Sequence, residues 1–599
     1  MSHNQSSTHN PIPVSALTGS MFDYARAEGA DLIGRTRPFD NWRQCRLDHH
    51  VWPFSRIINS APGAKMDIAD EAGQGREGIS LACQDYLGLT SHPRVREAAV
   101  KALHDLGPHS AGSPALAGNT SLSLLLETRL SEALKTEHIV LFPTGWAAGY
   151  GSITGLVRPT DHIVMDQLAH ACLQQGAFAA TRNVFKHPHC DNNAVKKILQ
   201  SIRAEDKANG IMVITEGLFS MDSDVPDIAP LQDICREFNA TLFVDVAHDF
   251  GSMGENGGGS LAMQNMLGKV DLVMGSFSKT FSSNGGFLAT SSRAVKQYIK
   301  FYGSPQTFSN GLSPVQAAVV LEALSIVRSA EGKTLREKLN DNAVKLRKRL
   351  ENKNIHCIGV PSAIVPAHIG SEAVGRIAWA YAQTQGVHAN LVEFPAVAVG
   401  SARFRMQLMP SHTPEQMSLV SDIIAASIDH AQQEVKKIEF PAPKRARYIA
   451  EAGTFSIAGK ALPALSQDDM QKLLSAATKK TFAKEAILIK EGTQPDGLFV
   501  ITRGTATVEI DYLGDRLVLA ECGEGEVLGE MSLLTTQKAS ATVVAHTDVE
   551  AMLVDRETLA KQVTKDPGFG TRFYQSLAIV LANRLRHKNS TAVPSLISG

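Results

Sequence analysis

The sequence lacks most features that mark a specialised class of protein. Its seven cysteines are scattered and form no C-x-x-C pair, which argues against a disulfide framework and a cysteine-ligated zinc site. Its 59 basic and 60 acidic side chains nearly cancel, so bulk charge points to neither nucleic acid nor an anionic membrane. No apolar run approaches the roughly 18 residues of a membrane helix, and the polar N-terminus MSHNQSSTHNPIPV has no signal-peptide core. We expect a cytoplasmic protein.

The first half of the chain has the pattern of an α/β domain. Short apolar runs read as buried strands at 138–143, 161–166, 210–217, 240–248 and 270–275. Segments with helical spacing lie between them, at 191–208 and 227–239. Apolar strands that alternate with helices predict a mostly parallel sheet with helices on both faces. Ligands of such sheets bind at the carboxyl ends of the strands.

The periodicity and composition of the sequence change twice after this region. The next stretch is helical and then mixed, which predicts a small α/β subdomain, and a basic, proline-containing stretch without periodicity reads as a linker. Short alternating strands with frequent turn residues then predict an all-β jelly roll with a final helix. The predicted divisions are an N-terminal arm (1–75), a large α/β domain (76–310), the small subdomain (311–440), the linker (441–465) and the all-β domain (466–590).

Polar residues follow three successive predicted strands. The segment TEGLFSMDSD, with Ser220, follows the first strand, Asp245 and His248 come after the second, and Ser276, Ser278 and Lys279 come after the third. A lysine that forms a Schiff base, a carboxylate that pairs with a pyridinium nitrogen and hydroxyls near a phosphate are what pyridoxal 5′-phosphate (PLP) requires. Each residue alone is common in a loop, but their order after consecutive strands predicts a PLP site.

Six motifs, in order, resemble those of the α-oxoamine synthase family of fold-type I PLP enzymes. The motifs are QDYLGLTSHPRVREAA, FPTGWAAG, DQLAHACL, TEGLFSMDSD, VDVAHDFG and GSFSKTF. The family includes 8-amino-7-oxononanoate synthase, 5-aminolevulinate synthase and serine palmitoyltransferase, and the resemblance covers roughly residues 45–435. It implies the fold-type I architecture, with a large PLP-binding domain and a small C-terminal subdomain.

The resemblance also implies roles for individual residues. Lys279 is the expected Schiff-base lysine and proton carrier, Asp245 the partner of the pyridinium nitrogen, and His248 the partner of the 3′-oxygen of the ring. His170 is expected to stack on the ring face. The other cofactor contacts implied by the motifs are Gly145, Trp146, Ser220, Ser276 and Ser278, together with Ser309 and Asn310, which would reach across a homodimer to the partner's phosphate.

The same resemblance implies the substrates. Arg405, preferred over Arg403, would grip the carboxylate of the amino acid, with Gln84 at the position of an assisting asparagine. The implied reaction condenses glycine, alanine or serine with an acyl thioester, usually acyl-CoA, and releases CO2, the thiol and an α-oxoamine. Three positions depart from the family pattern: Pro114 replaces an arginine, Ser123 a histidine and Val246 a second acid.

Two other functions stay open from the sequence. One is another fold-type I reaction, such as aldol cleavage or transamination. The histidine of AHAC, the DYLGL segment and the segment that contains Arg405 argue against it. The other is a ligand sensor that uses the PLP fold as a non-catalytic scaffold. The complete set of Lys279, Asp245 and His248 argues against that, because a scaffold would not need it.

Residues 470–588 resemble a cyclic-nucleotide-binding domain. The segment GEGEVLGEMSLLTTQKASATVVA resembles its phosphate-binding cassette, in which Glu530 would bind the ribose and the backbone at Gly529 would approach the phosphate. The arginine expected immediately before Ser540 is Ala539, and it follows Lys538. We therefore expect a degenerate nucleotide site, kept for dimer contacts or for another small ligand as effector.

Overall fold

The computed structural model describes residues 12–440, except 26, 28, 72 and 74, and residues 462–591, except 463, 513, 514, 536 and 537. The fold consists of two compact units that divide between Ile438 and Glu439. Most of the predicted linker, 441–461 and 463, lies outside the described residues. Among the described residues, no helix combines the length and the apolar character that crossing a bilayer requires.

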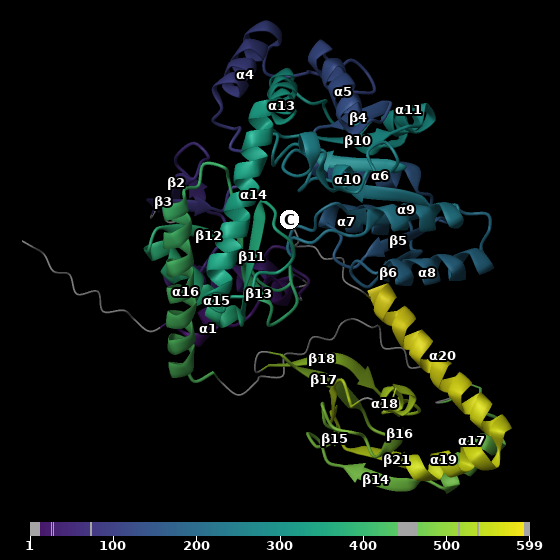
Figure 1. Cartoon of the computed structure of the whole chain (residues 1–599). Helices are drawn as coiled ribbons and strands as arrows, with labels where there is room; N and C mark the ends of the chain where they lie inside the picture. Colours follow the sequence, from purple (N-terminus) through teal and green to yellow (C-terminus); the bar gives the residue numbers. More distant parts are fainter. Residues whose placement is uncertain are drawn as a thin grey trace, which may run out of the picture. The chain divides into compact units, whose positions relative to one another are not determined.

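A seven-stranded sheet forms the centre of the first unit (Figure 1). Its order is β4-β10-β9-β8-β7-β5-β6, and all neighbours from β9 to β6 pair in parallel. Strand β10 pairs antiparallel with both β4 and β9. The strands are β4 (His138–Phe142), β5 (His162–Asp166), β6 (Val184–His187), β7 (Ile211–Glu216), β8 (Thr241–Asp245), β9 (Leu272–Ser276) and β10 (Gly286–Thr290). The mostly parallel sheet is confirmed, and β6 and β10 are additions to the predicted strands.

Both faces of this sheet are buried. On one face, strand side chains share a core with α6 (Gly145–Leu156), α7 (Ala171–Ala180) and α11 (Arg293–Tyr302). The alternate strand residues Val213 and Val244 are also fully buried, as the unbroken apolar runs predict. The predicted crossover helices are α8 (Asn192–Glu205) and α9 (Ile228–Glu237).

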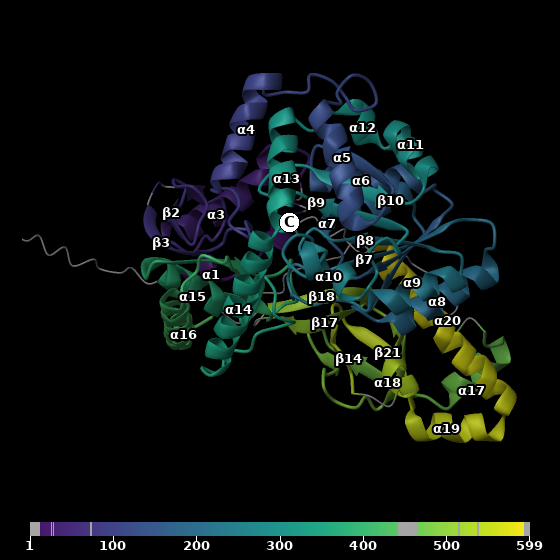
Figure 2. The same cartoon turned by 45° about the horizontal axis from the view of Figure 1, so that its top comes forward.

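A second sheet has six strands, which come from the N-terminal and the C-terminal parts of the first unit. Its order is β1-β2-β3-β12-β13-β11. Figure 1 labels five of these strands, and Figure 2 shows β2 and β3 from a second direction. The strands are β1 (Ile57–Ile58), β2 (Lys65–Ala69), β3 (Gly75–Leu81), β11 (Ile364–Gly370), β12 (Val387–Val392) and β13 (Ala402–Gln407). Strand β3 pairs in parallel with β12, which lies about 300 residues further along the chain. Strand β3, which begins at the boundary predicted between 75 and 76, therefore shares a sheet with strands of the predicted small subdomain.

Further helices complete the first unit. They include α4 (Pro93–Leu106), α5 (Ser121–Leu134), α12 (Ser304–Phe308), α13 (Pro314–Val327), α14 (Ala330–Glu351), α15 (Glu372–Thr384) and α16 (Pro414–Lys437). Helices α13 and α16 begin with capping boxes, Ser313 with Gln316 and Thr413 with Gln416, each followed by proline at the first helical position.

The second unit is built from two antiparallel four-stranded sheets. Their orders are β14-β21-β16-β19 and β15-β20-β17-β18. The strands are β14 (Thr478–Phe482), β15 (Ile487–Ile489), β16 (Gly497–Arg503), β17 (Ala506–Tyr512), β18 (Asp515–Cys522), β19 (Val527–Leu528), β20 (Thr542–Ala545) and β21 (Val549–Asp555). Apolar side chains of both sheets share one core. Helices α17 (Gln467–Ser475), α19 (Arg556–Lys565) and α20 (Pro567–Thr591) flank the sheets, and α18 (Glu530–Thr535) follows β19.

Candidate active site

Acidic residues and a lysine meet at the carboxyl edge of the large sheet. Glu216 ends β7 and is in register with Asp245, which ends β8 and is in register with Met274 of β9. Lys279 lies three residues beyond the end of β9 and is half-buried. The strand register thus brings Asp245 and Lys279 to one place, as the sequence predicts. It adds Glu216, which stands in the TEG motif but was not a candidate.

The electrostatics of this edge favour a neutral amine beside acidic groups. Burial raises the pKa of Asp245 to about 6, against the opposing charge of Lys279. Burial and the neighbouring Asp245 carboxylate hold the pKa of Glu216 well above its usual range. Burial also lowers the pKa of Lys279. A lysine with a lowered pKa is a better nucleophile toward an aldehyde.

His170 lies against the same edge. Its Nδ1 accepts the backbone N–H of Cys172 at 3.3 Å, which caps α7, and lies 3.0 Å from the Cys172 Sγ. The backbone N–H of His170 donates to Glu216 at 2.7 Å. Ligand-type atoms of His170, Cys172 and Asp245 all lie within 4.8 Å of one another. Burial and the charge of Lys279 lower the pKa of His170 to about 4, so the ring is neutral at neutral pH.

His248 is fixed from a distant part of the chain. Its Nδ1 lies 2.8 Å from the hydroxyl of Tyr86, and both side chains are buried. Tyr86 also hydrogen-bonds with Arg405. Because a guanidinium only donates, the Tyr86 oxygen accepts from Arg405 and its hydrogen is left for Nδ1 of His248. Burial holds the pKa of His248 well below its usual value, so the neutral ring carries its proton on Nε2.

The two candidate arginines on β13 have different surroundings. Arg403 pairs with the Asp222 carboxylate and donates to the carbonyl of Met221 at 3.3 Å. Arg405 donates from Nε to the carbonyl of Ser220 at 2.5 Å. Among the described residues, no carboxylate lies within ion-pair distance of Arg405, although this side chain is 5% exposed. Arg405 is therefore the arginine left with an unneutralised charge.

The residues predicted to hold the phosphate lie at the start of α6 and at or just after the end of β9. Thr144 caps the N–H of Ala147 at 3.0 Å, while the first amides of the helix, at Gly145 and Trp146, have no acceptor within the helix. The hydroxyls of Ser276 and Ser278 lie 2.8 Å apart. A Cβ added to Gly145 would overlap the Ser276 side chain. Two hydroxyls beside a glycine-fronted helix N-terminus form an arrangement that suits a phosphate.

Four predicted residues make other contacts here. Ser220 touches Arg405 through its carbonyl. The hydroxyl of Ser309 donates to the carbonyl of Pro305 at 2.7 Å, and the amide nitrogen of Asn310 lies 3.1 Å from Nε2 of His109. Gln84 accepts the N–H of Tyr86 through its backbone carbonyl at 2.9 Å. Their predicted ligand contacts stay predictions.

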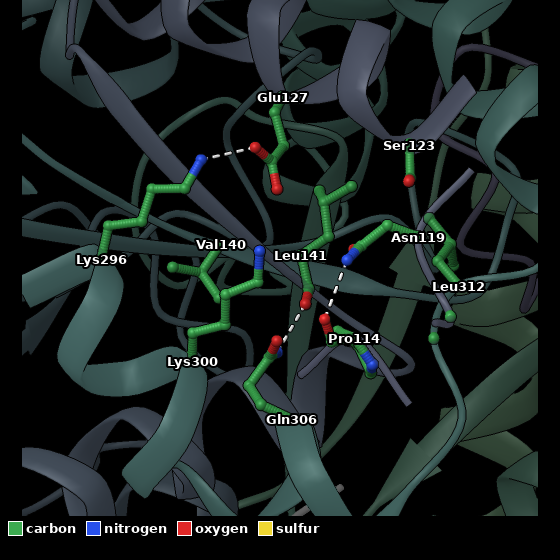
Figure 3. Close-up of a pocket in the computed structure, with 12 residues that line it drawn as sticks. Pro114, Asn119, Ser123, Glu127, Val140, Leu141, Lys296, Lys300, Gln306 and Leu312 are labelled. Atoms are coloured by element: carbon green, nitrogen blue, oxygen red, sulfur yellow. Dashed lines mark hydrogen bonds and ion pairs between the residues drawn. The ribbon is translucent and has the colours of Figure 1, made fainter. Parts of the chain in front are cut away.

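Two of the three departures from the family pattern line a single pocket. Figure 3 shows Pro114 and Ser123 in its wall, together with Lys300 and an ion pair between Lys296 and Glu127 at 2.5 Å. The third departure, Val246, is buried directly after β8. The substitutions at residues 114 and 123 therefore fall in the wall of this pocket, whereas Val246 is the chain neighbour of Asp245.

The fold and the carboxyl-edge site are those of a PLP-dependent enzyme of fold type I. Residues 76–424 match the aminotransferase class I and II family. The 8-amino-7-oxononanoate synthase of Geotalea daltonii is 32% identical over 351 residues, 59% of this chain and 88% of that protein. The 4-hydroxy-2,2′-bipyrrole-5-methanol synthase of a Serratia species is 29% identical over 70% of this chain and 64% of that protein.

Solved structures agree with these relatives. A serine palmitoyltransferase with a PLP internal aldimine superposes with a TM-score of 0.63 at 25% identity and covers 67% of this chain and 99% of its own. The chain belongs to the class I and II aminotransferase family and, within it, to the PLP-dependent α-oxoamine synthases. The residues around Lys279 fit the cofactor, because the buried acid, the neutral histidines and the cradle at Gly145 each meet one part of it.

Residues 479–566 match the cyclic nucleotide-binding domain family. Gly529 has a positive φ of 86°, and a Cβ there would approach the carbonyl of Gly497 to 2.6 Å. Glu530 is buried at the start of α18. Ala539 exchanges backbone hydrogen bonds with Gly492 and Thr493, each 2.8 Å long, and packs its side chain against the core.

The position expected to hold a positively charged side chain in this cassette is occupied by alanine. Lys538 and Ser540, the residues on either side of Ala539, are exposed. The side chain that packs inward at this position is therefore a methyl group, where a charged partner for a cyclic phosphate was expected.

Proposed function

We propose that this α-oxoamine synthase condenses a small amino acid, glycine, alanine or serine, with an acyl thioester, most simply an acyl-CoA. The observation that carries this proposal is the unneutralised Arg405 beside the Tyr86–His248 pair, in the same site as Lys279. An uncompensated, buried guanidinium favours a carboxylate, and its fork can bind both oxygens.

Each residue then has a defined task. Arg405 holds the amino-acid carboxylate, with the side chain of Gln84 assisting. Lys279 takes the proton from the α-carbon onto Nζ, for which its lowered pKa prepares it. Bound PLP supplies an electron sink for the negative charge that develops at that carbon. Asp245 would keep its charge beside the pyridine nitrogen, Nε2–H of His248 would donate to the 3′-oxygen, and the neutral ring of His170 would cover one face of the cofactor ring.

We also propose a homodimer in which Ser309 and Asn310 approach the partner's phosphate site. The support is an exposed aromatic surface beside them. Phe308 is 85% exposed, and Tyr298 stacks on Tyr302 on the adjoining helix α11 with both rings exposed. Contiguous exposed apolar side chains of this size are typical of protein interfaces.

For the second unit we propose a small-ligand effector site that does not take cAMP or cGMP in the usual way. A cyclic phosphate that enters this cassette would lose a charge-assisted hydrogen bond, about 1.5–3 kcal/mol, because residue 539 is alanine. Binding of such a ligand would be detected as a change in the activity of the first unit.

Spectroscopy of the purified protein tests the main proposal. PLP bound to Lys279 should give a visible absorption band that changes when glycine, alanine or serine is added, and Lys279→Ala should lose the band. Thiol release across an acyl-CoA series should then identify the acyl chain. A band without thiol release for any acyl-CoA would contradict the condensation while leaving the cofactor assignment intact. Lys269→Ala, a substitution of a surface lysine that precedes β9, is the matched control.

A further inference from the structure

His189 lies between two carboxylates that come from different loops at the carboxyl edge. Its Nδ1 is 2.9 Å from the Asp166 carboxylate, and its Nε2 is 2.6 Å from the Asp224 carboxylate. Asp166 ends β5, His189 follows β6, and Asp224 follows β7. These strands are neighbours in the sheet. The edge of Phe219 packs on the imidazole, with ring centroids 4.4 Å apart and planes at 89°.

Geometry determines the charge of this histidine. An ionised carboxylate only accepts hydrogen bonds, so both ring nitrogens of His189 have to carry hydrogen. Burial opposes protonation, but the hydrogen bonds to Asp166 and Asp224 outweigh it and raise the pKa of His189 to about 12. The arrangement is therefore a half-buried imidazolium that joins two carboxylates through charge-assisted hydrogen bonds.

Each of the two aspartates makes hydrogen bonds within a loop of the active site. Asp166 accepts the N–H groups of Leu168 and Cys190, both at 2.9 Å. The first of these bonds shapes the short connection that leads to His170. The backbone carbonyl of Asp224 accepts the N–H of Phe219 at 3.0 Å, which closes the loop 219–224.

The loop 219–224 in turn holds both arginines of β13. The carbonyl of Ser220 accepts from Arg405, and Met221 and Asp222 accept from Arg403. One imidazolium thus links the loop that positions the ring-face histidine to the loop that positions the carboxylate-binding arginine.

We infer that His189 is a positioning residue that fixes His170 and Arg405 relative to each other for amino-acid binding. This inference rests on the proposed roles of His170 and Arg405. His189 touches neither cofactor nor substrate, and it acts through Asp166 and Asp224. Loss of its charge would leave two carboxylates facing each other across the gap and would loosen both loops.

The test replaces His189 with a neutral side chain of similar reach. His189→Gln should raise the KM for the amino acid about 10-fold or more, as expected for loss of charge-assisted hydrogen bonds that set an arginine, with a smaller fall in kcat. Hydrogen exchange in the cofactor-free protein should speed up at the amides of Leu168, Cys190 and Phe219. The double variant His189→Gln with Asp224→Asn should recover part of the KM, because it removes one unpaired carboxylate.

His162→Gln is the matched control. His162 also hydrogen-bonds a carboxylate, Asp206 at 2.8 Å, but it begins β5 at the opposite end of that strand. This variant should leave both the KM and the loop exchange unchanged. If His189→Gln fails to fold, Asp224→Asn alone supplies the same readouts, with the same direction expected.

Two results separate this inference from the proposed function. An unchanged amino-acid KM and unchanged loop exchange in His189→Gln would overturn the positioning role, even in an active enzyme. If the wild type shows no PLP band, the proposed function fails, while the exchange experiment on the cofactor-free protein still decides whether His189 holds the two loops.

Discussion

The hydroxyl of Tyr86 lies 2.8 Å from Nδ1 of His248, and the two residues are 162 positions apart in the chain. The Tyr86 oxygen accepts a hydrogen bond from Arg405, so its own hydrogen is donated to Nδ1 of His248. The proton of the neutral His248 ring is therefore on Nε2, which is the donor in the site. The tautomer of an active-site histidine is thus set by a residue from the N-terminal DYLGL segment.

Tyr86→Phe tests this bond. The variant leaves Nδ1 of His248 buried without its donor, which should cost about 1–3 kcal/mol of unfolding free energy. The amino-acid KM should rise about 10-fold, because Arg405 loses an acceptor that orients it. Thermal melts and steady-state kinetics measure the two effects. Tyr381→Phe, which changes a half-buried tyrosine on α15, is the control, and equal effects in both variants would contradict a special role for Tyr86.

The contribution of Asp245 to the stability of the cofactor-free protein should fall as the pH rises through about 6. The pKa of Asp245 is raised by burial from its ordinary value to about 6, so the folded state binds a proton that the unfolded state releases at lower pH. This stabilisation is fully present below the ordinary carboxyl pKa of about 4 and is lost as the pH passes about 6. Denaturant titrations from acidic to neutral pH would show the decline.

Asp245→Asn provides the comparison for that experiment. The uncharged amide removes one titrating group, so the decline near pH 6, the pKa of Asp245, should become smaller. Glu216 still contributes in this variant, because its own pKa is raised. Identical pH profiles for the two proteins would show that the Asp245 carboxylate does not titrate in this range.

Conservative changes at the two arginines of β13 should have different consequences. Arg405→Lys should raise the amino-acid KM on the order of 100-fold with little loss of stability, because an ammonium cannot bind both carboxylate oxygens through a fork. Arg403→Lys weakens the pair with Asp222 and should chiefly lower the melting temperature. Kinetics and melts on both variants decide the assignment, and a larger KM effect at Arg403 would reverse it.

Gly145→Ala should weaken PLP binding strongly. The added Cβ would overlap the side chain of Ser276, so α6 has to shift away from the cradle. We expect the PLP dissociation constant to rise at least about 10-fold, measured by the visible band against cofactor concentration. Adding Ser276→Gly should restore part of the affinity, because it removes the overlapped atoms. A double variant no better than the single would show that the clash is not the cause.

The C-terminal domain should not bind cAMP or cGMP tightly, and Ala539→Arg should strengthen binding of either on the order of 10- to 100-fold, the value of a charge-assisted phosphate contact. Calorimetry on the full chain measures both proteins. Lys538→Ala, at the exposed neighbouring position, should have no effect. Submicromolar binding by the unchanged protein would overturn the interpretation of Ala539.

The sequence by itself determined the parallel sheet, the all-β domain and the set Lys279, Asp245 and His248. These follow from local periodicity and from chain order, because residues after consecutive parallel strands reach one edge. Motif resemblance added Arg405, His170 and the PLP chemistry. Local patterns carry this much because strand length, apolar alternation and turn residues are short-range properties.

Only the tertiary structure decided the rest. Three long-range contacts join segments that no local pattern connects: the pairing of β3 with β12, the hydrogen bond from Tyr86 to His248, and the hydrogen bond of His189 with Asp224. The tertiary structure also distinguishes the surroundings of Arg403 and Arg405, which lie on one strand with the same side-chain period, because the position of Asp222 shows which of the two charges is neutralised. Long-range contacts of this kind depend on how the folded loops meet, which the periodicity of a single segment does not encode.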